Sequence, residues 1–133
     1  MVFTEDYARV AMTDTGPTVL VVEDDPDVRD LIVEILDAEG LNAVGDPDIA
    51  SAVHRVTGAP PDAAVIDYAL PDGVGTDLCK ILRGRRVPCM ILSAYPRPDT
   101  TEARAQPWMQ KPFSVPVLAE AVRTLLVQPP APN

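Results

Sequence analysis

The sequence has little cysteine, few aromatic residues and an excess of acidic over basic side chains, and each shortage excludes a class of protein. Two cysteines in 133 residues exclude a disulfide-rich scaffold. Cys79 and Cys89 lack metal-ligand spacing and fall in apolar stretches, so we expect buried, reduced thiols. Lys and Arg number 11 against 20 Asp and Glu, and the resulting net charge of −9 opposes sequence-independent binding to nucleic acid or an anionic membrane.

Long hydrophobic runs are also missing. No run approaches the roughly 18 apolar residues of a membrane helix, and the N-terminus lacks the basic-then-apolar order of a signal peptide. We therefore expect a cytoplasmic protein. The length suits one domain over 17–128. Residues 1–16 are expected to form a mobile extension and residues 129–133 a Pro-rich tail. The sequence does not decide whether the natural protein starts at Met1 or Met12, or whether it is stand-alone or excised from a larger protein.

What the chain does contain is an alternation of strand and helix patterns. Short apolar runs predict strands over 18–22, 41–44, 63–66, 87–92 and 108–110. Helical spacing of apolar residues predicts helices over about 26–39, 47–56, 78–84 and 115–126. Asp25-Pro26, Asp46-Pro47 and Ser114 are expected to cap three of these helices. The alternation predicts an α/β three-layer sandwich with a parallel sheet.

The stretch from Tyr95 to Pro107 breaks this regularity. It contains Pro96, Pro98 and Pro107, which leave room for only a couple of helical turns. We therefore expect the fourth helix of the alternation to be shortened or distorted.

Polar residues follow four of the predicted strands at their carboxyl ends. They are Glu23-Asp24, Asp67, Ser93 and Lys111. In a parallel sheet these ends lie along one edge, so the side chains can meet there. Crowded carboxylates repel one another unless a cation relieves them, and Mg²⁺ favours such oxygen ligands. An aspartate beside Mg²⁺ and a lysine can act as a nucleophile toward a phosphoryl group, with a hydroxyl donating to its oxygens.

On these residues the chain resembles the receiver domain of two-component response regulators, in the single-domain form of the chemotaxis regulators. The resemblance covers about residues 17–127. The motifs that carry it are Val21-Val22-Glu23-Asp24-Asp25-Pro26, Asp67 with Leu70-Pro71 and Gly75, Ser93-Ala94, and Lys111-Pro112-Phe113. It implies a five-stranded parallel sheet in the flavodoxin-like order 2-1-3-4-5, with the site at the topological switch point.

The resemblance also implies roles for the acidic residues. Asp67 matches the phosphoacceptor, which receives a phosphoryl group from a sensor histidine kinase or a histidine phosphotransfer protein. Asp24 matches a direct Mg²⁺ ligand, and Glu23 its acidic neighbour, which usually acts through water. The backbone carbonyl of Ala69 matches a further metal ligand.

Three more positions match the family's residues that contact the phosphoryl group or change conformation when it is bound. Ser93 matches the hydroxyl that turns toward it, and Lys111 the base that pairs with it. Trp108 occupies the aromatic switch position, where the family more often has Tyr or Phe. The implied protein is a signalling switch that assists its own Mg²⁺-dependent phosphorylation and dephosphorylation, and is not otherwise an enzyme. Its expected output is contact with a downstream protein, without nucleic acid or membrane, or onward phosphotransfer.

Two alternatives remain. The first is a protein-binding module that kept the fold but no longer depends on phosphorylation. The shortened segment 95–107 favours it, whereas the complete set of acidic, hydroxyl and lysine residues opposes it. The second is a small phosphatase with an aspartate nucleophile. Such enzymes typically carry a second Asp two residues after the nucleophile, and Ala69 occupies that position here.

Overall fold

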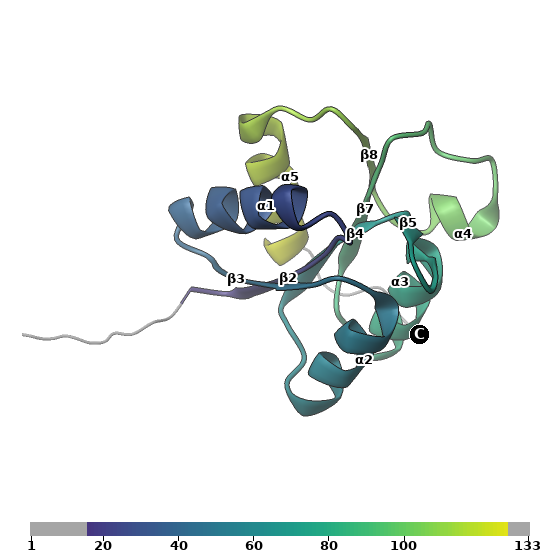
Figure 1. Cartoon of the computed structure of the whole chain (residues 1–133), viewed down its shortest axis with the longest axis horizontal. Coiled ribbons are helices and arrows are strands. Elements are labelled where there is room, and N and C mark those ends of the chain that lie inside the picture. The colour runs from purple at the N-terminus through teal and green to yellow at the C-terminus, as the bar shows by residue number, and fades with distance from the viewer. Residues whose placement is uncertain (1–15, 128–133) are drawn as a thin grey trace, which may run out of the picture.

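Five parallel strands form the sheet at the centre of the computed structural model, which describes residues 16–127 (Figure 1). They are β2 (Thr18–Val22), β3 (Asn42–Asp46), β4 (Ala63–Asp67), β7 (Cys89–Ser93) and β8 (Trp108–Gln110). The strands are ordered β3-β2-β4-β7-β8 in space. The predicted order 2-1-3-4-5 is thereby confirmed. The expected extension, apart from Gly16, and the expected tail lie outside the described residues.

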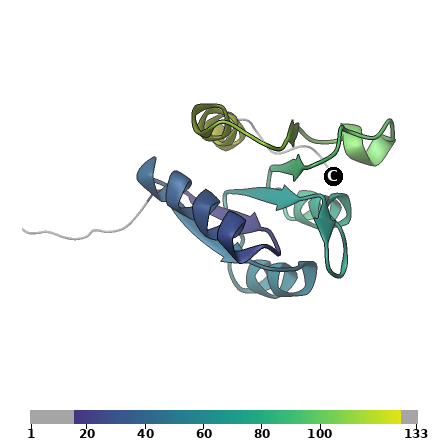
Figure 2. The same cartoon turned by 45° about the horizontal axis from the view of Figure 1, so that its top comes forward.

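Two helices cover each face of the sheet (Figures 1 and 2). They are α1 (Pro26–Ala38) with α5 (Val115–Val127), and α2 (Ile49–Gly58) with α3 (Gly75–Gly84). Because side chains alternate along a strand, β2 supplies Val19 and Val21 to the core under α1 and α5. Its Leu20 and Val22 enter the core under α2 and α3. This is the predicted three-layer sandwich, and none of the described helices is long and apolar enough to cross a membrane.

The helix ends follow local sequence signals. Asp25 caps α1, its Oδ1 accepting from the Asp27 N–H at 2.9 Å, and Pro26 begins the helix. Gly40 follows the last turn with φ +84°, a left-handed conformation that favours glycine. Ser114 caps α5, with its Oγ accepting from the Val117 N–H at 3.2 Å. The predicted caps at Asp25 and Ser114 are confirmed.

The expectation for Asp46 is wrong. We predicted a strand over 41–44 and Asp46 as a helix cap, but Asp46 ends β3 and Asp48 caps α2 by accepting from the Ser51 N–H at 2.8 Å. Asp46 is buried and binds the Arg55 guanidinium through both oxygens, at 2.7 Å to Nε and 3.0 Å to Nη2. A bidentate arginine satisfies a buried carboxylate, so Asp46 can remain inside the strand.

The fourth helix is short, as predicted. The helix α4 spans only Thr101–Arg104, with Thr100 as its N-cap. The preceding strand begins at Cys89 rather than at 87, since Pro88 has no N–H to contribute to the sheet. The third helix begins at Gly75, three residues before the predicted start.

Arg86, just past the end of α3, has an unusual backbone conformation. Its φ of +63° places a side-chain-bearing residue in the left-handed region, where the Val87 N–H bonds back to the Leu82 carbonyl at 3.0 Å. The left-handed conformation destabilises a residue with a side chain by about 1–2 kcal/mol, and glycine would relieve this strain. Glycine would also lower the stability by about 0.5–1 kcal/mol, because it has more conformational freedom to lose on folding. Arg86→Gly should therefore raise the free energy of unfolding by about 0.5–1 kcal/mol in urea titrations.

Arg85 supplies the matched control for this substitution. It has φ −101°, a conformation that any residue adopts. Arg85→Gly should lower the free energy of unfolding, because glycine brings only its entropic cost there. Equal effects at the two positions would contradict the explanation.

Candidate functional site

Three carboxylates meet at the carboxyl edge of the sheet. Glu23 and Asp24 follow β2, and Asp67 ends the neighbouring strand β4; one oxygen from each lies within 4.8 Å of the other two. Glu23 is 2% exposed and Asp67 8% exposed, whereas Asp24 faces solvent. Burial strengthens their mutual repulsion, so the arrangement calls for positive charge.

Lys111 supplies part of that charge. It follows β8, and its Nζ lies 2.7 Å from Glu23 Oε1 and 3.5 Å from Asp67 Oδ2. Burial lowers the pKa of Lys111, but the hydrogen bond with Glu23 and the charge of Asp67 outweigh burial and raise the pKa above its ordinary value. One lysine among three carboxylates leaves net negative charge, and the donors are all oxygens. This donor set fits a small, hard divalent cation.

Ser93 ends β7, the strand on the other side of β4. It is buried, and its Oγ accepts from the Tyr95 N–H at 2.9 Å. Its carbonyl accepts from the Lys111 N–H at 2.7 Å, which fixes the two residues side by side. A hydroxyl that accepts one hydrogen bond can still donate its own proton. Ser93 therefore retains a donor at this edge of the sheet.

Trp108 begins β8 and lies beside an aromatic neighbour rather than among the carboxylates. Its Nε1 donates to the Tyr95 carbonyl at 3.1 Å, and its ring centroid lies 5.1 Å from that of Tyr68 at a tilt of 52°. The backbone of Tyr95 thus contacts both Ser93 and Trp108. Sequence reasoning missed Tyr68, although its place directly after Asp67 was a usable signal.

A short hairpin follows Asp67. Strands β5 (Ala69–Leu70) and β6 (Gly73–Val74) pair antiparallel. The Ala69 N–H donates to Asp67 Oδ1 at 3.4 Å, and the Gly75 N–H donates to the Tyr68 carbonyl at 2.7 Å. A Cβ on Gly75 would lie 2.3 Å from the Asp67 carbonyl oxygen, so only glycine allows α3 to approach β4 this closely.

The tip of this hairpin is held by α2. Asp72 Oδ1 accepts from the Ile49 N–H at 2.9 Å, and its Oδ2 accepts from the Ala50 N–H at 3.0 Å. A carboxylate at a helix N-terminus also interacts favourably with the helix dipole. The segment after Asp67 is therefore fixed at its tip by α2 and at its base by Gly75.

The family of the chain follows from a match to the response regulator receiver domain over residues 19–123. The chain belongs to this family. The receiver is 32% identical to the DNA-binding response regulator MtrA of Mycolicibacterium smegmatis over 115 residues, 81% of this chain and 50% of that protein. It is 42% identical to the DNA-binding transcriptional activator DevR/DosR of Mycobacterium tuberculosis over 81 residues, 58% of this chain and 37% of that protein.

A solved receiver has the same architecture. The BeF3-activated N-terminal receiver domain of Klebsiella pneumoniae RstA superimposes with a TM-score of 0.74 at 29% identity, covering 84% of this chain and 99% of that one. The receiver described here spans half or less of MtrA and DevR/DosR.

The receiver brings most of its predicted site residues to one edge of the sheet. Glu23, Asp24 and Asp67 form the carboxylate cluster, and Lys111 contacts two of them. Ser93 is adjacent through the Lys111 backbone. Ala69 contacts the cluster through its N–H, whereas Trp108 begins β8 and contacts Tyr95 and Tyr68 instead.

Proposed function

We propose that this receiver accepts a phosphoryl group on Asp67 from the phosphohistidine of a sensor histidine kinase or a histidine phosphotransfer protein. The observation that carries the proposal is the buried Asp67 carboxylate, which lies beside an acidic pair and 3.5 Å from the Lys111 ammonium. An Asp67 oxygen bonds to phosphorus as the phosphorus–nitrogen bond breaks, and the histidine leaves with a proton. Lys111 is positioned to pair with the transferred oxygens.

Mg²⁺ is the cation we propose for the carboxylate cluster. Glu23, Asp24, Asp67 and the backbone carbonyl of Ala69 would hold it, and the oxygen donor set supports this choice. When bound, Mg²⁺ neutralises charge on the phosphoryl oxygens. The Ser93 hydroxyl, already at the edge of the site, would donate to one of them.

The proposed output is a change of protein-binding surface. If Ser93 turns toward the phosphoryl group, its contact with the Tyr95 N–H is lost, and Tyr95 is also the acceptor for Trp108. We propose a signalling switch of this kind, acting in the cytoplasm on a downstream protein and without turnover of a separate substrate. MtrA and DevR/DosR are named as DNA-binding proteins, so the absence of nucleic acid from this chain's partners stays a prediction.

The phosphorylation-independent module is not favoured. A binding module would have no use for three carboxylates crowded around one lysine, because such an arrangement opposes folding when no cation is bound. The short α4 affects which surface the protein presents to a downstream partner, and it does not affect phosphoryl transfer to Asp67.

Phosphorylation of the isolated protein tests the proposal. Phosphoramidate and Mg²⁺ should add one phosphoryl group to the intact mass, and a chelator should prevent the addition. Amide NMR with Mg²⁺ and beryllofluoride, a stable mimic of the phosphoryl group, should shift resonances around Asp67, Ser93 and Lys111. No mass increase together with no beryllofluoride shifts would contradict the proposal.

Trp108 offers an intrinsic probe of the switch because it is the chain's one tryptophan. Beryllofluoride with Mg²⁺ should change its fluorescence emission, since the indole loses its hydrogen bond to Tyr95 and its packing on Tyr68. Fluoride or Mg²⁺ alone should leave the emission nearly unchanged. Unaltered emission in a sample whose NMR spectrum shows beryllofluoride bound would refute the switch role of Trp108.

A further inference from the structure

Each polar group of Glu23 has a hydrogen-bond partner, and an arginine binds its main-chain carbonyl. The Glu23 N–H donates to the Asp46 carbonyl at 3.0 Å, and the Glu23 carbonyl accepts from Arg29 Nη1 at 2.8 Å. The Glu23 carboxylate accepts from the Lys111 ammonium at 2.7 Å and from the Asp25 N–H at 3.2 Å. The Arg29 guanidinium therefore acts on the main chain of a residue whose side chain is in the carboxylate cluster.

The carbonyl that Arg29 binds belongs to the peptide group between Glu23 and Asp24. A peptide group is planar, so a fixed Glu23 carbonyl also fixes the Asp24 N–H. The orientation of this plane sets the direction in which both acidic side chains leave the main chain. These side chains supply two of the three carboxylates in the cluster. A contact with this one carbonyl thus controls the geometry of the acidic pair.

Two local features bring the Arg29 guanidinium to this carbonyl. The Arg29 N–H donates to the Asp25 carbonyl at 2.9 Å in the first turn of α1, and a helical side chain leans toward the N-terminus, here back over the link from β2. The stem of Arg29 lies against β3 at Gly45, where an added Cβ would lie 2.9 Å from Arg29 Cδ and 3.0 Å from Arg29 Cγ. Glycine at this position leaves the space that the stem occupies.

We propose that Arg29, lying across Gly45, is a positioning residue for the cation site, because it holds the peptide that orients the two acidic side chains toward Mg²⁺. The inference rests on the proposed function, which assigns Mg²⁺ to the carboxylate cluster. Groups that orient metal ligands typically contribute about 10–100-fold to metal affinity. Since Asp67 lies on a different strand, β4, Arg29 acts on the affinity for Mg²⁺ rather than on the rate of phosphoryl transfer once Mg²⁺ is bound.

Arg29→Gln tests the proposal through the sign of its effect. Glutamine suits a helix but is too short to reach the Glu23 carbonyl. If the guanidinium acted only through its charge, its removal would strengthen the binding of a nearby cation. We expect the opposite, an affinity for Mg²⁺ about tenfold weaker, measured from amide NMR shifts in a titration with Mg²⁺ alone at constant ionic strength.

Phosphorylation by phosphoramidate gives a second measurement on the same variant. The Mg²⁺ concentration for half-maximal rate should rise about tenfold in Arg29→Gln, while the rate at saturating Mg²⁺ stays within about twofold of the wild type. A variant that was merely less stable would not separate these two quantities.

Gly45→Ala displaces the same guanidinium without changing the charge. The added Cβ takes the place of the Arg29 stem, so the affinity for Mg²⁺ should fall in this variant as well. Substitutions that remove the same contact are not additive. The double variant Gly45→Ala/Arg29→Gln should therefore bind Mg²⁺ no more weakly than Arg29→Gln. Because each single variant tests the contact by itself, the test survives if one of them fails to fold.

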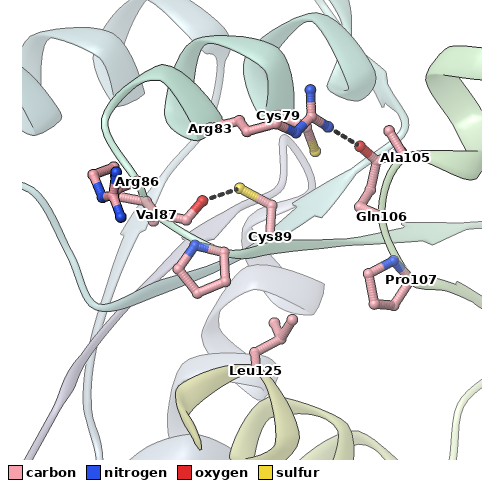
Figure 3. A pocket seen from close by; sticks show the side chains of 10 residues that line it. Cys79, Arg83, Arg86, Val87, Cys89, Ala105, Gln106, Pro107 and Leu125 are labelled. Carbon is pink, nitrogen blue, oxygen red and sulfur yellow. Dashed lines mark hydrogen bonds between the residues drawn. The ribbon is translucent and has the colours of Figure 1, made fainter. Parts of the chain in front are cut away.

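Arg83→Gln is the matched control. Arg83 is also half-buried and donates a hydrogen bond, from Nη2 to Gln106 Oε1 at 3.1 Å, but it lies at the end of α3 away from Gly75 (Figure 3). There it lines a cavity together with Cys79 and Cys89, which are buried, free thiols. The control variant loses the same charge and a comparable contact. Any loss of stability should appear in urea unfolding, while the affinity for Mg²⁺ stays at the wild-type value.

The titrations separate failure of this inference from failure of the proposed function. An affinity for Mg²⁺ that is unchanged or stronger in Arg29→Gln and Gly45→Ala would show that the acidic pair does not depend on this contact. Losses that add fully in the double variant would show that Gly45 does not act through Arg29. Wild-type protein that binds no Mg²⁺ would contradict the proposed cation itself.

Discussion

Asp67→Asn should abolish phosphoryl transfer to the chain while leaving the fold intact. Asparagine has the shape of aspartate but lacks the carboxylate nucleophile, so phosphoramidate and Mg²⁺ should leave the intact mass unchanged. Stability should change little, by about 1 kcal/mol or less, because the attraction to Lys111 and the repulsion from Glu23 and Asp24 are lost together. Intact mass and urea unfolding measure the two effects separately.

Asp25→Asn is the control for this substitution. Asp25 is an exposed carboxylate next to the acidic pair, but its role is to cap α1, and asparagine caps a helix about as well. This variant should be phosphorylated like the wild type. An Asp67→Asn protein that still gains phosphate would mean that another residue is the acceptor.

Gly75→Ala should have the second largest effect on phosphorylation. It leaves the Asp67 carboxylate in place chemically but displaces its backbone. The added Cβ would lie 2.3 Å from the Asp67 carbonyl oxygen and 3.0 Å from Ile66 Cγ2, and neither neighbour is free to move. Overpacking of this kind costs about 1–3 kcal/mol. Relief requires α3 to retreat from β4, which moves the backbone of Asp67. A displacement of about 1 Å can lower a reaction rate about 100-fold, and we expect a loss of that order in phosphorylation rate.

Gly84→Ala provides the comparison at the other end of the same helix. A Cβ on Gly84 would meet no atom within 4 Å, so alanine should stabilise the protein by about 0.5–1 kcal/mol and leave phosphorylation unchanged. If Gly75→Ala keeps both its stability and its phosphorylation rate, the close approach of α3 to β4 is not what positions Asp67.

The features best predicted from the sequence are those that depend on neighbouring residues or on the topology of the sheet. The Asp25 cap was predictable because its acceptor and donors lie within three residues of one another. The meeting of Asp67 and Lys111 was predictable because every strand of a parallel sheet ends at the same edge. The order of the strands followed from the family resemblance rather than from any pattern in the residues.

What the sequence did not reveal has two causes: side chains whose neighbours are chosen by packing, and strands too short to leave a pattern. Asp46 looked like a helix cap because Arg55, its partner inside the fold, carries no local signal. Cys79 and Cys89 line the same cavity because of how α3 lies against β7, a packing arrangement that no local pattern indicates. The hairpin after Asp67 was missed because two-residue strands leave no periodicity in the sequence.

The ion pair between Lys111 and Glu23 joins residues 88 positions apart in the chain. Among the described strands, β8 lies at the edge of the sheet and pairs only with β7. A contact of such long range requires a long loop to close, and closing it costs chain entropy. A folding intermediate without β8 would carry the crowded carboxylates without their lysine. Acceptance of a phosphoryl group would then report that the last strand has docked, so incompletely folded chains would stay silent in signalling.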